Sequence, residues 1–159
     1  MLEGQFRNPS GCAISAIFDR SGKRFSGEDI IKSIAIMHDR SNGLGGGFAA
    51  YGIYPEYKDY YAFHVFYDSL ASKRECEEYL EKRYDIVNLS KIPTRKIKEI
   101  TDEPLIWRYF VAPLKTRLDS SQLSPDEFVA KSVFFVNLHI KGAYVFSSGK
   151  NMGIFKAVG

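Results

Sequence analysis

Cysteine is scarce in this sequence, since its 159 residues include only Cys12 and Cys76. Two cysteines are too few for the disulfide framework of a small secreted protein. No apolar run approaches the roughly 18 residues that a membrane-spanning helix requires. Residues 1–8 also lack the apolar core of a secretion signal. These absences favour a protein of the reducing cytoplasm and give no indication of a membrane partner.

The sequence also lacks a large net charge, and it lacks histidines and cysteines at the spacing typical of metal ligands. The 22 basic and 19 acidic residues leave a formal net charge of only +3, which is too small to indicate a nucleic-acid partner by itself. The three histidines, His38, His64 and His139, have no metal-like spacing to one another or to the cysteines. We therefore expect no metal site and no cofactor, and we interpret His64 and His139 as structural.

The sequence does contain enough apolar and aromatic residues to form a hydrophobic core. Apolar residues make up 45% of the chain and aromatic residues 14%, as in a globular protein with one domain or one domain carrying an insertion. Periodicity and capping signals predict an α+β protein whose middle, from Tyr60 to about Phe146, has the β-α-β-β-α-β order of a ferredoxin-like segment. The expected elements are strands at 12–18, 48–53, 60–68, 85–92 and 105–111, helices beginning at Ser26, Ser72 and Ser124, and a hairpin of 143–147 with 152–157.

Cys12 is the first candidate for chemistry, because it follows a flexible Pro-Ser-Gly lead and opens the short apolar run 12–18. If the chain were cut before Cys12, one residue would carry both a thiol and an α-amine. These groups have ordinary pKa values of about 8.5 and about 7.7–8.0, so the residue would supply a nucleophile with its own base. The alternative is that Cys12 is one of the many buried, inert cysteines of protein cores.

Two further patterns have structural alternatives. The glycine-rich stretch 43–47 follows a helix and enters a strand, whereas a dinucleotide-binding loop leaves a strand and opens a helix. Close backbone packing, or a site wall of bare backbone, is the better interpretation. Residues 141–146 partly match the basic-Gly-aromatic signature of RNA-binding sheets, but in the expected order they form the last strand, where an aromatic stripe is more often core.

Three segments, taken together, resemble a known family. They are Gly11–Ile17, which includes Cys12; Met37–Gly52, which includes Arg40 and the glycine-rich stretch; and Val145–Lys156. The chain resembles the class II glutamine amidotransferase domain, which has the N-terminal-nucleophile hydrolase fold. The match is closest to the form associated with archaeal-type glutamate synthase, and it runs from about residue 11 to residue 159.

The resemblance implies that a leader, residues 1–11, is removed and that Cys12 then attacks the side-chain amide of glutamine. It implies substrate binding by Arg40, Asn42 and Gly43, although the family motif usually continues with Gly and an Asp or Ser where this chain has Ser41-Asn42-Gly43. It also implies a partial αββα-type hydrolase sheet from residues 12–59 and 142–159, with residues 60–141 as an inserted ferredoxin-like subdomain. The implied partners are glutamine and a glutamate synthase subunit that accepts the ammonia.

Family members carry later segments that this chain does not contain: an Arg-Thr region, an Asn-Gly oxyanion hole and an Asp that holds the substrate amine. The resemblance thus predicts the N-terminal part of a catalytic domain, inactive alone, with another chain supplying the rest. The alternative is a non-catalytic binding or assembly module built on the ferredoxin-like segment. An RNA-binding sheet is a third possibility.

Overall fold

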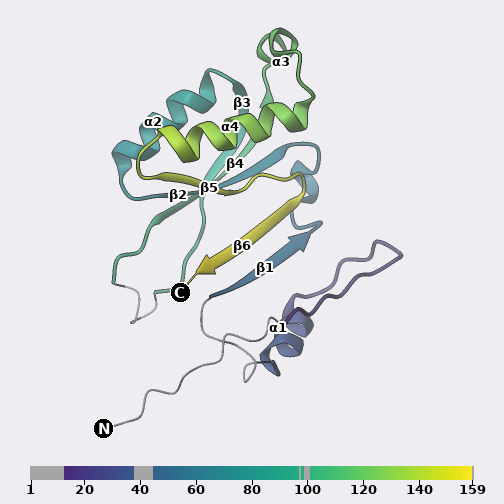
Figure 1. Ribbon diagram of the computed structural model, residues 1–159. Coiled ribbons are helices and arrows are strands. Elements are labelled where there is room, and N and C mark those ends of the chain that lie inside the picture. Colours follow the sequence, from purple (N-terminus) through teal and green to yellow (C-terminus); the bar gives the residue numbers. More distant parts are fainter. Residues whose placement is uncertain (1–12, 38–44, 97, 99–100, 159) are drawn as a thin grey trace. The chain divides into compact units, whose positions relative to one another are not determined.

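The structure is a computed structural model that describes residues 13–37, 45–96, 98 and 101–158 (Figure 1). Backbone contacts divide the chain into two compact units. One unit is residues 48–155, and the other combines residues 1–47 with 156–159. The described helices are α1 (Glu28–Ala35), the 3-10 helix η2 (Pro55–Tyr57), α2 (Leu70–Glu81), α3 (Lys115–Ser121) and α4 (Pro125–His139). The described strands are β1 (Gly45–Tyr51), β2 (Tyr61–Tyr67), β3 (Tyr84–Lys91), β4 (Leu105–Pro113), β5 (Ala143–Ser147) and β6 (Met152–Val158).

The described strands form two antiparallel sheets, so the expected mixture of helices and strands is confirmed. The larger sheet has the strand order β3-β4-β2-β5, and α2 and α4 lie side by side over one of its faces (Figure 1). Along the chain its elements follow the order β2-α2-β3-β4-α4-β5, which is the predicted β-α-β-β-α-β order. The short helix α3 is an addition to this order and lies between β4 and α4 in the chain.

Strand β2 explains the aromatic run in the middle of the sequence. Six of its seven residues are buried, because both faces of this central strand are covered. Phe63, Val65 and Tyr67 belong to the main core with residues of α2 and α4. On the other face, His64 packs against Phe155 of β6. The compact unit 48–155 includes β5, which belongs to the same sheet as β2, β3 and β4.

The sequence predicted the N-cap residue of α4 correctly but not that of α2. Ser124 caps α4 as predicted: its hydroxyl accepts from the Glu127 amide while the Glu127 carboxylate accepts from Ser124, which is a complete capping box. The prediction for α2 was wrong by one turn, since Ser69 is the cap and its hydroxyl accepts from the Ser72 amide at 3.1 Å. Ser72 is instead buried inside the helix, because a second serine three residues earlier occupies the capping position.

The predicted hairpin of residues 143–147 with 152–157 was also wrong. Both strands exist, but β5 pairs with β2 and β6 pairs with β1. Local sequence shows two strands separated by turn residues, and it does not show the distant strand with which each one pairs. The chain between them bends at Asn151, which has a positive φ of 50°.

Candidate functional site

The four residues proposed for the glutamine site, Cys12, Arg40, Asn42 and Gly43, lie outside the described residues. The segments on either side of them are described: residues 13–37 between the two motifs, and β1 after the second.

The segment that follows Cys12 is not the buried strand that its apolar sequence predicts. Residues 13–18 form no regular structure, and Ile14 and Phe18 are 88% and 86% exposed. A strand needs a neighbour to pair its backbone groups, and none of the described strands pairs with this run. Ser15 is linked to α1 by a hydroxyl–hydroxyl contact of 2.6 Å with Ser33. A turn follows at Asp19, whose carboxylate accepts from the Ser21 amide at 2.8 Å.

Helix α1 forms where the sequence predicts a helix, with Gly27 rather than Ser26 at its N-cap position. Its apolar residues do recur at helical spacing, but the face that they form is not buried within the described residues. None of residues 13–37 is buried. The segment therefore presents several large apolar side chains to solvent. Its exposed large side chains are Ile14, Ile17, Phe18, Phe25, Ile31, Ile34, Ile36 and Met37.

The end of β1 is fixed by the residue before β6. Asn151 holds it twice: its carbonyl accepts from the Gly52 amide at 2.7 Å, and its side-chain oxygen accepts from the Tyr54 amide at 2.8 Å. Gly52 has a φ of 73°, which suits its place in the turn after β1. The glycine-rich strand is thus tied at this end to a sequence-distant partner.

His64 is the most deeply enclosed ionisable group on the second face of the sheet. It is fully buried, its Nε2 lies 2.7 Å from the Tyr54 hydroxyl, and the ring of Phe146 lies 5.8 Å from its own. Burial away from water, with a smaller contribution from the charge of Arg108, lowers the pKa of His64 to about 4. The ring is therefore neutral at physiological pH, and its enclosure agrees with the structural role that we expected.

Cys76 is unsuited to be a nucleophile. It is fully buried on the inner face of α2, and this burial raises the pKa of its thiol to about 11. Next to it, the Tyr67 hydroxyl donates to the Tyr109 hydroxyl, which donates to Glu77 at 3.0 Å. Glu77 also pairs with Lys73 at 2.6 Å. Each polar group of this network has a partner, so it is well suited to stabilise the core and leaves no group free to react.

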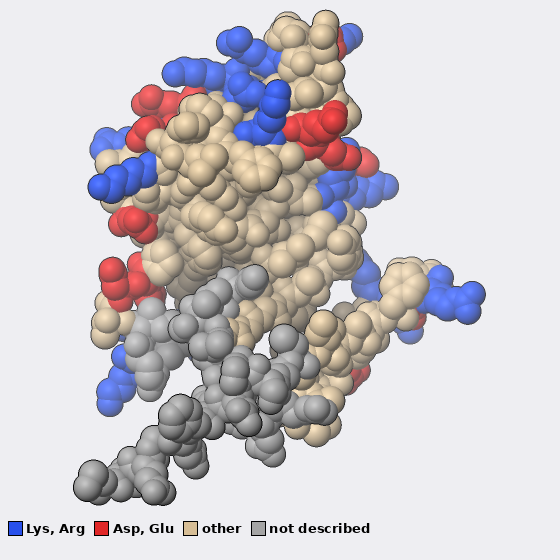
Figure 2. Space-filling view, viewed as in Figure 1, with Lys and Arg blue, Asp and Glu red and all other residues tan. Residues whose placement is uncertain are grey.

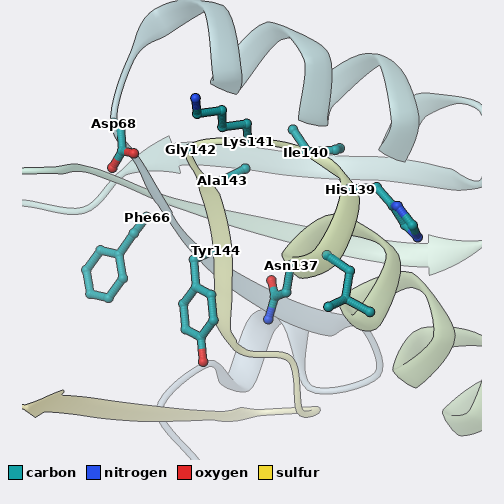
Figure 3. A pocket seen from close by; sticks show the side chains of 10 residues that line it. Phe66, Asp68, Asn137, His139, Ile140, Lys141, Gly142, Ala143 and Tyr144 are labelled. Carbon is teal, nitrogen blue, oxygen red and sulfur yellow. The ribbon is translucent and has the colours of Figure 1, made fainter.

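A hollow of about 400 Å³ lies between the end of α4 and β5, and Figure 3 shows the side chains around it. Phe66 and Tyr144 supply aromatic surface, and Asp68 lies at the rim near Gly142. Asn137 projects from α4 to the edge of β5, where it donates to the Val145 carbonyl at 3.1 Å and accepts from the Val145 amide at 2.7 Å. The lining also includes His139 and Lys141.

The aromatic residues of 141–146 fit the core interpretation better than an RNA-binding platform. Phe146 stacks on Phe66 at 4.2 Å and lies 5.6 Å from the ring of Phe155. Only Tyr144 is largely exposed, and it stands on β5, an outer strand of the sheet. RNA-binding sheets present several exposed rings for stacking, which this face does not offer.

Within the described part of the chain, no three residues of the metal-binding types His, Cys, Asp and Glu come together to hold an ion. Across the same residues, every helix is too short or too polar to cross a membrane.

Comparison with known proteins gives one informative match. No family model matches the chain. A protein of Archaeoglobus fulgidus, described as an uncharacterized protein, is 48% identical over 155 residues. The match covers 96% of this chain but 41% of that relative, so the chain spans about two fifths of the relative's length.

Proposed function

We propose that this chain is the N-terminal part of a class II glutamine amidotransferase domain of the N-terminal-nucleophile hydrolase type. Its role would be to release ammonia from glutamine for a glutamate synthase partner. The observation that carries the proposal is the pairing of Cys12, at the head of an apolar run, with the motif at Arg40 and the glycine-rich stretch after it. The other cysteine, Cys76, is buried and its thiol has a raised pKa, so it is not an alternative to Cys12.

The chemistry begins once residues 1–11 have been removed. The Cys12 thiol attacks the side-chain carbonyl carbon of glutamine, and its proton passes to the α-amine of the same residue. The carbon–nitrogen bond breaks, ammonia leaves with that proton, and a thioester remains. Water then hydrolyses the thioester to give glutamate and restore the thiol. Arg40, Asn42 and Gly43 hold the substrate in this proposal.

Two observations support the view that the chain acts together with further polypeptide. The exposed apolar side chains of residues 13–37 need a covering layer, and the segment that bears them directly follows Cys12. The relative of Archaeoglobus fulgidus is more than twice as long as the matched region. Because the oxyanion hole of the family lies in its later segments, and one oxyanion donor contributes about 10²–10³ in rate, we expect this chain alone to be inactive.

The test is a comparison of the two cysteines in the protein produced together with the products of its neighbouring reading frames. Intact mass should show a chain that begins at Cys12. A diazoketone analogue of glutamine should label Cys12 and leave Cys76 unlabelled, since the Cys76 thiol is buried and protonated at neutral pH. Release of ammonia from glutamine should disappear in Cys12→Ala and persist in Cys76→Ser. A mature chain that keeps residues 1–11 and still hydrolyses glutamine would refute the proposal.

The alternative function, a non-catalytic binding module, is favoured by one observation. Residues 48–155 have a closed core of their own, and their larger sheet has the βαββαβ order found in many binding domains. An uncut chain that binds a synthase subunit but neither hydrolyses glutamine nor reacts with the diazoketone would establish this alternative.

A further inference from the structure

A second hollow, of about 320 Å³, lies where α4 begins and where the chain turns between β5 and β6. Its wall is formed by Tyr61 at the start of β2, by residues of the first turns of α4, and by the turn 148–150. Figure 2 shows both acidic and basic side chains in the region where, in Figure 1, α4 begins and β5 leads into β6. The lining residues all belong to the compact unit 48–155, and neither the proposed glutamine site nor the hollow beside Asn137 includes any of them.

Asp126, in the first turn of α4, presents to this hollow a carboxylate that the protein holds in place. Its Oδ1 accepts a hydrogen bond from the Tyr61 hydroxyl at 2.5 Å, and Tyr61 itself is only 5% exposed. Burial and the neighbouring carboxylate raise the pKa of the Tyr61 phenol, so it stays protonated and remains the donor. The second carboxylate oxygen, Oδ2, makes no hydrogen bond to another described residue, so it is able to accept one from a ligand.

Lys150 supplies the opposite charge from the turn between β5 and β6. Its Nζ lies 4.8 Å from the centre of the Tyr61 ring, whose face attracts a cation. The turn is attached to β2, since Lys150 forms an antiparallel bridge with Tyr61. The next residue of β2 adds a second link, because the Ala62 amide donates to the Gly149 carbonyl at 2.9 Å. Neither Lys150 nor Asp126 forms an ion pair with any described residue, so the two opposite charges line one hollow without pairing with each other.

The two charges favour a ligand that itself carries both signs. A simple anion would be attracted by Lys150 but repelled by Asp126, and a simple cation would experience the reverse. A zwitterion directs its ammonium group to Asp126 and its carboxylate to Lys150, so that both attractions act together. Val129 and Ala130 add apolar surface against which an aliphatic side chain packs. We propose that this hollow binds a free aliphatic α-amino acid, with its amine on Asp126 and its carboxylate on Lys150.

The ligand should be small and weakly bound. The volume of about 320 Å³ lies at the lower end of the range of ligand pockets, about 300–1,000 Å³, which suits a free amino acid better than a peptide or a nucleotide. Asp126 and Lys150 are exposed, and water screens exposed charges, so we expect a dissociation constant on the order of 1 mM. Because the hollow uses none of the residues of the proposed glutamine site, binding here does not require glutamine hydrolysis.

The first test is an NMR titration of the isotope-labelled full protein with three probes of similar shape. They are L-valine, L-valinamide, which lacks the carboxylate, and isovalerate, which lacks the amine. L-Valine should shift the backbone amide signals of Ala130 and Gly149, which line the hollow, in a saturable way. Valinamide and isovalerate should each bind about tenfold more weakly or worse, since each lacks one of the two charged groups. Equal binding of L-valine and either analogue, or no shift at these two amides, would overturn the proposal.

The second test repeats the L-valine titration on variants of the protein. Asp126→Asn and Lys150→Gln should each weaken binding about tenfold or more, and both should fold normally because the two side chains are exposed. Lys131→Gln, at an exposed lysine of the same helix, is the matched control and should bind L-valine like the unmodified protein. Unchanged binding in Asp126→Asn or in Lys150→Gln would contradict the proposal. So would an equal loss in Lys131→Gln, which would show that binding follows the general charge of the surface.

Discussion

The buried imidazole of His64 makes the stability of the protein depend on pH in a specific way. Its pKa is about 4 in the folded protein and about 6.5 when the chain is unfolded. Between these two values the unfolded chain binds a proton at this residue and the folded chain does not. Folding therefore becomes less favourable as the pH falls from 6.5 toward 4, and the stabilisation is fully present only above pH 6.5.

The magnitude follows from the same two pKa values. The complete difference corresponds to about 3 kcal/mol in the free energy of unfolding. About 2 kcal/mol of it should already be lost at pH 5, above the ordinary pKa values of most carboxylates, which makes pH 5 the useful condition. The surroundings of the ring explain why a small rearrangement of the folded protein would not stabilise its protonated form. Aromatic rings surround His64, and its one close polar side-chain contact is the Tyr54 hydroxyl at 2.7 Å.

The measurement is urea unfolding at pH 7.5 and at pH 5, with linear extrapolation to water. His64→Gln should lower stability at pH 7.5 because the ring leaves a gap, but it should lose about 2 kcal/mol less than the unmodified protein between the two conditions. His139→Gln, at an exposed position near the end of α4, is the control and should keep the full pH dependence. Equal losses in the unmodified protein and in His64→Gln would refute the reasoning.

Three further predictions concern stability, each measured as the free energy of unfolding in urea. Asn137→Ala should cost about 1–3 kcal/mol because it removes both hydrogen bonds at the outer edge of β5, and Asn137→Asp should not recover this loss, because a carboxylate oxygen would replace the donor to the Val145 carbonyl. Gly142→Ala should cost more than Gly22→Ala: both have a positive φ, but a Cβ at residue 142 would meet the Ser72 hydroxyl at 2.6 Å while residue 22 has open space. Ser124→Ala should cost about 1 kcal/mol through the lost cap of α4, and no loss would show that the capping box does not stabilise this helix.

Local signals in the sequence predicted most elements of the unit 48–155. The aromatic run at β2, the helical spacing in α2 and the Ser-Pro start of α4 each act over a few residues, and the structure contains all three elements. The errors involve partners that are distant in the chain. The pairing of β6 with β1, and the use of Asn137 to close the edge of β5, depend on contacts that no local pattern encodes.

The candidate site was predicted from a resemblance to a family rather than from local structural signals. The motifs at Cys12 and Arg40 identify a chemistry because their residue types and order resemble a family, and they lie outside the described residues. Apolar periodicity correctly predicted α1, but the inference of a buried strand at residues 12–18 assumed a neighbour to pack against. The hydrophobic pattern of a segment indicates which side chains it can bury, but it does not indicate which polypeptide covers them.

The contrast between the two units suggests how activity would be controlled if Cys12 is the nucleophile. Residues 48–155 bury their own core, whereas none of residues 13–37 is buried and α1 has only eight residues. A helix of that length is marginal in water without packing. Polypeptide that covered α1 would therefore stabilise this helix, and in the proposed function this covering would accompany assembly of the catalytic site. Glutamine hydrolysis would then begin only in the assembled protein, where an acceptor for the ammonia is present.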